Sequence, residues 1–216
     1  MSQPQPASKR SLAHRISEHL WEWRLGVQTL GLILPEELAL PPGGKQYTPT
    51  PYRGFMHLMS QVPAQFTRGC FVDFGCGMGR TLVLAKKYFP FTRAVGVEFN
   101  AQLCQIARAN THSLANVEII QTDARSFAIP QDASTVFLFN PFGGEVLRQV
   151  VANIEAAPRE LMVAVCNYRE FLQITRMPLI AKGEMSPRIS WALFHLNAPT
   201  TLTPKPQKPG VSGPPR

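Results

Sequence analysis

From residue 65 onward, short apolar runs alternate with segments of helical period, and this alternation constrains the fold more than any other feature of the chain. Apolar runs bounded by turn residues predict strands at 70–75, 94–99, 117–121, 135–140 and 161–166. Apolar residues at helical spacing predict helices at 81–88, 101–111, 145–154 and 168–175. Strands that alternate with helices pair in parallel, with helices packed on the sheet. The sequence therefore predicts a doubly wound α/β domain.

The end of this region departs from the alternation. Two apolar runs at 179–182 and 189–196 are separated by Gly-Glu-Met-Ser-Pro and predict a hairpin. Such a hairpin places one antiparallel strand in the sheet. We therefore expect a mostly parallel, seven-stranded sheet with an antiparallel terminal hairpin.

The residues before this region predict helices of their own. Apolar side chains at spacings of three and four predict an N-terminal helix that lies against the domain: Leu12, Ile16, Leu20, Trp23, Val27 and Leu30. A second short helix is predicted at 53–62. We expect a helical lead-in at 11–64 and a sheet domain at 65–197. The ends, 1–10 and 198–216, have no periodic apolar pattern and are predicted to be disordered.

The net charge of +8 raises the question of a nucleic-acid partner. The two ends contribute +5 of this charge and contain no acid; their cations are Lys9, Arg10, Lys205, Lys208 and Arg216. The remaining body carries only +3 (8 − 5). A nucleic-acid partner is therefore possible but is not required by the charge.

Cysteine spacing and hydropathy exclude several classes of protein. The four cysteines are scattered without a Cys-x-x-Cys pair, which indicates reduced thiols and argues against a disulfide framework or a metal site: Cys70, Cys76, Cys104 and Cys166. No apolar stretch approaches the roughly 18 residues that cross a bilayer. The first ten residues are not followed by the apolar core of a secretory signal. We expect a cytoplasmic protein with no membrane span.

The most informative motif is Val-Asp-Phe-Gly-Cys-Gly-Met-Gly-Arg-Thr, where the first predicted strand runs into a glycine-rich turn and a helix. Gly75, Gly77 and Gly79 let the backbone approach a ligand, and the helix N-terminus behind them favours a negative group. The last glycine of the dinucleotide-binding fingerprint comes one place later than Gly79 does here. Asp73, two residues before Gly75, can bind a cationic amine. The methionine part of S-adenosylmethionine carries an ammonium and a carboxylate, so it matches both features.

Two acids follow the next two predicted strands. Glu98 closes the strand at 94–99, where a carboxylate can accept hydrogen bonds from both hydroxyls of a ribose. Phe99 beside it can pack on an adenine or lie in the core. Asp123 follows the strand at 117–121 and can accept from an adenine amino group, although an aspartate there is more often a turn residue.

The fourth strand ends in Phe-Asn-Pro-Phe, at 139–142. Ligands of such sheets bind beyond the carboxyl ends of the strands, so the Asn140 amide oxygen can accept from a substrate amine there, with Phe142 beside it. The alternative is an Asn-Pro turn with a purely structural role. Three tyrosines are weaker substrate-side candidates, since their rings could equally pack in the core: Tyr47, Tyr52 and Tyr168.

Taken in order and spacing, these motifs resemble those of the class I S-adenosylmethionine-dependent methyltransferases, over about residues 65–196. The resemblance implies a cofactor site made by Asp73, Gly75, Gly77, Gly79, Glu98 and Asp123. Upstream, Arg-Leu-Gly-Val-Gln-Thr-Leu-Gly and Tyr-Thr-Pro-Thr-Pro-Tyr are similar to the lead-in of small bacterial members whose substrate is not assigned.

The Asn-Pro-Phe segment is similar to the Asn-Pro-Pro-aromatic signature of methyltransferases that act on adenine or glutamine amides, but it lacks the second proline. The resemblance implies N-methylation of an amine or amide on a protein, a base or a small molecule, with Asn140 as the catalytic residue. Three alternatives stay open: an O- or C-directed small-molecule methyltransferase, a non-catalytic nucleotide-binding or interaction module, and, disfavoured by the glycine spacing, a nicotinamide-dependent oxidoreductase.

Overall fold

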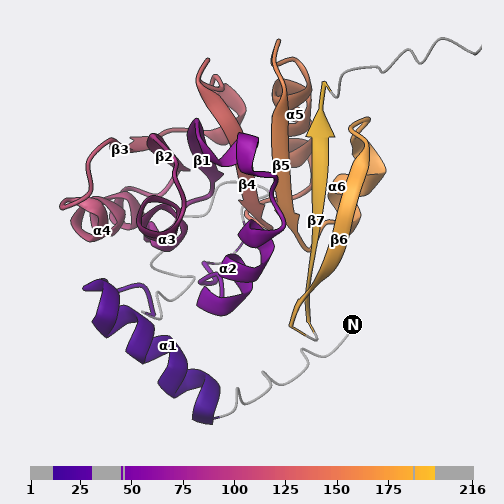
Figure 1. The fold of residues 1–216 in the computed structure, drawn as a ribbon. Helices are drawn as coiled ribbons and strands as arrows, with labels where there is room; N and C mark the ends of the chain where they lie inside the picture. Colours follow the sequence, from indigo (N-terminus) through magenta and orange to yellow (C-terminus); the bar gives the residue numbers. More distant parts are fainter. Residues whose placement is uncertain (1–11, 31–44, 46, 187, 198–216) are drawn as a thin grey trace, which may run out of the picture.

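The computed structural model describes residues 12–30, 45, 47–186 and 188–197. The predicted disordered ends, 1–10 and 198–216, lie outside the described residues. A seven-stranded sheet forms the centre of the fold, in the order β3-β2-β1-β4-β5-β7-β6 (Figure 1). Its strands are β1 Cys70–Phe74, β2 Arg93–Glu98, β3 Val117–Gln121, β4 Ala133–Phe139, β5 Leu161–Cys166, β6 Leu179–Ser186 and β7 Ile189–Leu196.

The pairing of the strands confirms the predicted fold class. β1 pairs in parallel with β2 and β4, β2 with β3, and β4 with β5. β7 runs antiparallel to both β5 and β6, so the terminal hairpin supplies the one antiparallel strand of this sheet. The chain leaves β1 toward β2 on one side and later returns to β4 on the other side. This change of direction opens a crevice at the carboxyl end of β1.

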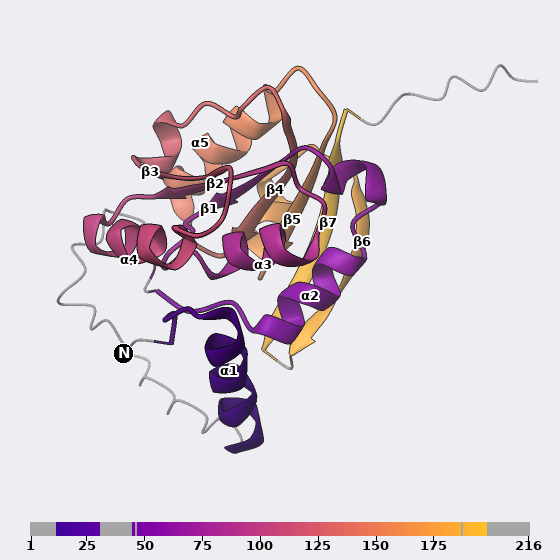
Figure 2. The ribbon, with the colours of Figure 1, turned by 60° about the vertical axis from the view of Figure 1, so that its left-hand side comes forward.

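Helices cover both faces of the sheet (Figure 2). The helices are α1 Leu12–Leu25, α2 Tyr52–Ser60, α3 Arg80–Tyr88, α4 Ala101–Thr111, α5 Gly144–Glu155 and α6 Arg169–Ile174, with short 3-10 turns η1 at Ala64–Thr67 and η2 at Ala124–Ser126. α2, α3 and α4 pack on one face, and α5 and α6 pack on the other.

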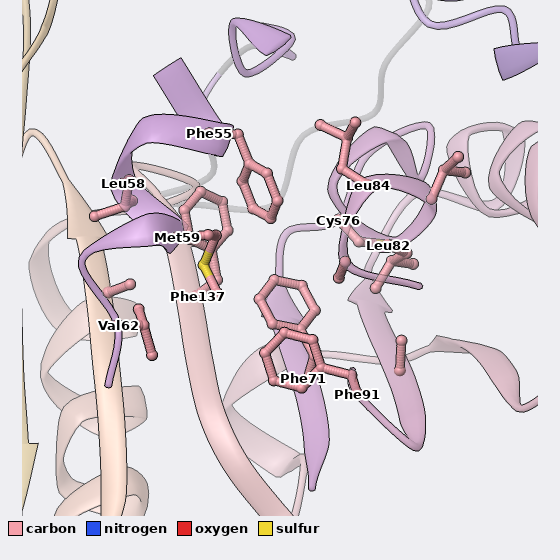
Figure 3. Close-up of a cluster of buried hydrophobic side chains, with 14 of the residues drawn as sticks. Phe55, Leu58, Met59, Val62, Phe71, Cys76, Leu82, Leu84, Phe91 and Phe137 are labelled. Atoms are coloured by element: carbon pink, nitrogen blue, oxygen red, sulfur yellow. The ribbon is translucent and has the colours of Figure 1, made fainter. Parts of the chain in front are cut away.

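Two apolar clusters fill the space between the sheet and these helices. Alternate residues of β1 point to opposite faces, so Phe71 lies in the cluster under α2 and α3 while Val72 and Phe74 lie in the cluster under α5. Figure 3 shows Phe55 of α2 among the rings of Phe71 and Phe137, both of which it contacts edge to face. A strand buried on both faces reads as a continuous apolar run, which is why these strands are recognisable in the sequence.

The first helix forms as predicted, but the apolar stripe that predicts it does not face the domain. Ile16, Leu20 and Trp23 are 51%, 60% and 84% exposed, whereas Glu18 is only 4% exposed. α1 is fixed by polar contacts of Glu18 and by Trp21, whose ring stacks on Tyr52 at 5.5 Å. Ion pairing and aromatic stacking, and not the apolar period, therefore set the rotation of α1.

Candidate functional site

A cavity of about 380 Å³ lies at the carboxyl ends of β1, β2 and β4. The glycine-rich turn forms its floor, and the ends of β2 and β4 form two sides. Residues 47–50, which precede α2, form a further wall. This volume and position are typical of the ligand sites of doubly wound sheets.

The glycine-rich turn depends on left-handed backbone at all three glycines. Gly75, Gly77 and Gly79 have φ values of 74°, 53° and 81°, which residues with a Cβ rarely adopt. A Cβ on Gly75 would overlap Pro141, and a Cβ on Gly77 would overlap the ring of Tyr47. Close approach by neighbouring segments therefore requires glycine at both positions.

Gly79 has a different role from the other two. It caps the N-terminus of α3 and does not line the cavity; a Cβ there would lie 3.2 Å from the Cβ of Ala107 in α4. The structure thus brings Gly75 and Gly77 into the cavity, while Gly79 shapes the turn and lets α4 pack closely.

We predict that Gly77→Val weakens cofactor binding at least about tenfold, because the new side chain displaces Tyr47 from the wall and strains the turn. Gly144→Val is the matched control: Gly144 also has a left-handed φ, 58°, but no atom lies within 4 Å of its added Cβ. Calorimetric titration with S-adenosylhomocysteine measures the affinity of both variants, and circular dichroism shows whether they fold. Unchanged affinity in a folded Gly77→Val protein would remove the turn from the site.

Asp73 lies at the bottom of the cavity and is almost fully buried, at 3% exposure. The Thr81 hydroxyl donates a short hydrogen bond to Asp73 Oδ2, and no described residue donates to Oδ1. Burial raises the pKa of Asp73 to about 7, against the opposing hydrogen bond from Thr81, and the nearby Glu98 carboxylate raises it further. A buried carboxylate with a free oxygen suits a cationic ligand group, which would supply the missing charge and hydrogen bonds.

Glu98 connects the end of β2 to the glycine-rich turn. Its Oε2 accepts from the Gly77 N–H at 3.0 Å, and its Oε1 accepts from the Asn100 N–H at 2.9 Å. Burial raises the pKa of this carboxyl group above its usual value. Glu98 and the half-exposed ring of Phe99 both line the cavity, so Phe99 is not a core residue. Each carboxylate oxygen keeps acceptor capacity that two ribose hydroxyls could use.

Asp123 also lines the cavity, but its carboxylate already has a partner. Both oxygens accept from the Arg125 guanidinium, at distances of 2.6 to 3.1 Å, and Oδ1 also accepts from the Arg125 N–H. This guanidinium holds the pKa of Asp123 below its usual value. An adenine amino group that bonds to Asp123 must therefore share the carboxylate with Arg125.

Asn140 lines the cavity where β4 ends, in a left-handed conformation with φ 50°. Its side-chain oxygen accepts from Lys45 Nζ at 2.5 Å. The Lys45 N–H donates to the Pro141 carbonyl at 3.1 Å, and Lys45 Nζ lies 3.9 Å from a carboxylate oxygen of Glu170. The oxygen that the sequence assigns to a substrate amine thus holds the amine of a lysine.

Two residues that line the cavity, Lys45 and Asn167, were not identified from the sequence. Lys45 lies in a loop with no pattern that marks it. Asn167 follows β5 as Asn140 follows β4, also with a left-handed φ of 53°, and this equivalence could have identified it. Of the three candidate tyrosines, only Tyr47 lines the cavity.

Other site types receive no support from the residues that the structure describes. Among them, no group of His, Cys, Asp and Glu side chains is arranged to hold a metal ion. The four cysteines are buried free thiols. No helix in the described part of the chain is long and apolar enough to cross a membrane.

Comparisons with known proteins agree with this geometry. Residues 71–160 match a family described as a methyltransferase domain. A trans-aconitate 2-methyltransferase of Azoarcus sp. (strain BH72) is 32% identical over 85 residues, which are 39% of this chain. The matched region is 32% of that enzyme, so this chain spans about a third of the length of the curated relative.

Solved structures share the fold. An RNA methyltransferase from Salinibacter ruber, in complex with S-adenosyl-L-homocysteine, superposes with a TM-score of 0.58 and 19% identity, covering 69% of this chain and 94% of that one. A putative methyltransferase from Escherichia coli gives a TM-score of 0.59 and 17% identity, covering 73% and 90%. Residues 71–160 are therefore similar to a methyltransferase domain, and the chain has the fold of these solved methyltransferases.

Proposed function

We propose that this protein transfers a methyl group from S-adenosylmethionine to an amine or amide acceptor held beside Asn140. The observation that carries the proposal is the convergence of Asp73, Glu98 and Asn140 in one cavity around a glycine-rich turn. When bound, S-adenosylmethionine supplies an electrophilic methyl group on its sulfonium. The contributions expected of the chain are positioning of the two reactants and exclusion of water.

The residues around the glycine-rich turn can be matched one by one to the chemical groups of S-adenosylmethionine. Asp73 is assigned to the ammonium, because it is buried and has one oxygen to which no described residue donates. Glu98 is assigned to the ribose hydroxyls, and Phe99 with Asp123 to the adenine. Gly75 and Gly77 provide the close backbone approach.

The acceptor end supports an amine. Lys45 Nζ is itself the nitrogen of a primary amine, and it donates a hydrogen bond to the Asn140 side-chain oxygen. A substrate amine can replace it there without any change in the hydrogen bonding of Asn140. In this proposal Asn140 orients the nucleophile, and no covalent intermediate on the protein is needed.

A carboxylate acceptor is the second candidate, and the same lysine favours it. A substrate carboxylate placed between Lys45 Nζ and the Asn140 amide N–H groups would receive charge-assisted hydrogen bonds. The name of the Azoarcus relative refers to aconitate, and aconitate is a carboxylate. The product would then be a methyl ester instead of an N-methyl compound.

The experiment is incubation of the protein with labelled methyl donor and fractions of a cell extract. Transfer to an amine or amide gives label that survives mild base, whereas label in a methyl ester is released. Lys45→Arg protein is included so that labelling of the protein's own lysine is not mistaken for an acceptor. Binding of the cofactor with no transfer to any fraction would favour the non-catalytic module.

A further inference from the structure

Arg80 follows the glycine-rich turn directly, yet its side chain points away from solvent and is only 2% exposed. Its Nη1 donates to Glu18 Oε2 at 2.6 Å and to the Thr50 carbonyl at 2.8 Å, and its Nε donates to Thr29 Oγ1 at 2.7 Å. Its guanidinium carbon lies 4.0 Å above the ring of Tyr52. Each of these partners precedes residue 71, so all lie outside the matched methyltransferase domain.

The partners of Arg80 are also bound to one another. Glu18 Oε1 accepts from the Tyr52 N–H at 3.2 Å. Glu22 Oε1 accepts from the N–H and the hydroxyl of Thr29, and it lies 3.6 Å from Arg80 Nη2. Buried charges are stable only when paired, so α1, Thr29 and the start of α2 are held together as long as Arg80 is present.

This network supports the wall of the cofactor cavity. The Tyr47 hydroxyl donates to the Thr29 carbonyl at 3.0 Å, and its ring lies against Gly77. Tyr47 and Thr50 line the cavity together with Asp73 and Gly77. The wall at 47–50 is thus attached to the glycine-rich turn through Arg80. Arg80 also lines the cavity, so a change there reaches the cofactor side both directly and through Tyr47.

The sheet does not depend on these contacts. α1 lies outside the layer of α2 and α3, away from the strands, in both views of the fold (Figures 1 and 2). Ile16, Leu20 and Trp23 of its apolar stripe are exposed, so its apolar contacts with the domain come mainly from Leu25 and Trp21. Release of α1 would remove Leu25 and Trp21 from the edge of the cluster under α2 and α3, and it would leave the cluster under α5 unchanged.

We propose that Arg80 is a positioning residue for cofactor binding: it fastens α1 and the wall at 47–50 to the glycine-rich turn, and the S-adenosylmethionine pocket is complete only when this fastening is intact. The inference rests on the proposed function, because it assigns that cofactor to the cavity.

The test compares Arg80→Met with Arg80→Lys and with Arg93→Met. Arg93 is an arginine at the start of β2 whose ion pairs with Glu118 and Asp132 are exposed, so it controls for the loss of a paired arginine. S-adenosylhomocysteine affinity is measured by calorimetry, and backbone protection of residues 15–30 and 47–58 by hydrogen exchange without ligand. We expect Arg80→Met to lose protection in both segments and to bind at least about tenfold more weakly, because fewer molecules have a complete pocket.

Arg80→Lys should give an intermediate affinity, since a lysine can pair with Glu18 but cannot reproduce the guanidinium contacts. Arg93→Met should match the wild type in both readouts. Wild-type affinity in Arg80→Met, or loss of protection at β1, β4 and β5 as well, would overturn the proposal.

Tyr47→Phe covers the case in which Arg80→Met does not fold. It removes one hydrogen bond and no charge, and it should weaken S-adenosylhomocysteine binding about threefold or more; unchanged affinity there would also overturn the proposal. If the wild type itself does not bind, the proposed function fails, while the exchange data still report whether Arg80 fastens α1.

Discussion

Asn140→Ala is expected to lower the rate of methyl transfer about 100-fold or more and to leave donor affinity within about threefold of the wild type. The Asn140 oxygen lies at the acceptor end of the cavity, where Lys45 Nζ now binds it. A contact that orients the nucleophile strengthens as the nitrogen aligns for attack, so its loss affects turnover more than cofactor binding. The measurement is the rate with labelled donor, beside a titration with S-adenosylhomocysteine.

Two glycine variants separate the side chain from the backbone in this experiment. Asn140 has a left-handed φ of 50°, so alanine strains the turn while glycine does not. Asn140→Gly should therefore lose as much activity as Asn140→Ala. Asn116→Gly removes another left-handed asparagine, φ 59°, just before β3 at the amino ends of the strands, and should keep full activity. Full activity in Asn140→Gly would reduce the segment to a structural turn and favour an oxygen, sulfur or carbon nucleophile.

Asp73→Asn is expected to weaken cofactor binding about 100-fold or more and, at the same time, to stabilise the ligand-free fold at alkaline pH. Loss of one partner from a buried charge pair costs on the order of 2–5 kcal/mol of binding free energy. Asparagine can still accept from Thr81, so the turn keeps its hydrogen bond. The weakened binding therefore reports the missing charge.

The stability effect follows from the raised pKa of Asp73, about 7, compared with about 4 in an unfolded chain. The folded state holds the proton more tightly, so the contribution of Asp73 to the free energy of unfolding is greatest below pH ~4 and falls as the pH rises through about 7. Above that pH, ionised Asp73 lowers the free energy of unfolding by a few kcal/mol at most. Asp73→Asn should be more stable than the wild type in urea unfolding at pH 8, and the difference should shrink toward pH 5.

Cofactor binding by the wild type should show the opposite pH dependence. An ammonium needs an ionised partner, so affinity should fall as the pH drops below about 7, and Asp73→Asn should lack this dependence. Equal affinities of the two proteins at pH 8 would contradict the assignment of Asp73 to the ammonium.

The centre of the sheet was predictable because β1, β2, β4 and β5 are buried on both faces and read as continuous apolar runs. β3, β5, β7 and α4 begin and end where the sequence predicts, and the other boundaries differ by a few residues. The cavity was predictable for a related reason: Asp73, Glu98 and Asn140 end or follow strands, and parallel strands bring their carboxyl ends to one edge.

The rotation of α1 could not be predicted in this way. The apolar period of Ile16, Leu20 and Trp23 indicated a packing face, but Glu18 and Trp21 make the contacts that hold the helix. The partner of Glu18 is an arginine 62 positions later, and no local pattern connects two residues so far apart. Hydrophobic periodicity predicts a helix; it does not predict an ion pair that overrides it.

The acceptor end was only half predictable, for the same reason. Asn140 is marked by its place after a strand, whereas Lys45 reaches it from a loop 95 residues earlier. Gly79 is the opposite case. Its place in the motif suggested a ligand contact, but a Cβ added to Gly79 would lie against Ala107 of α4. A motif fixes which residues are present, while the packing decides which of them face the ligand.

The central claim is that the cavity around Asp73, Gly77 and Glu98 binds S-adenosylmethionine. Calorimetric titration of the wild-type protein with S-adenosylmethionine, with S-adenosylhomocysteine and with a nicotinamide dinucleotide tests it most directly. We predict binding of the first two with one molecule per chain, and stabilisation of the fold by roughly 2.7 kcal/mol at ~100 times the dissociation constant. No heat with either compound, together with clear binding of the dinucleotide, would contradict the claim.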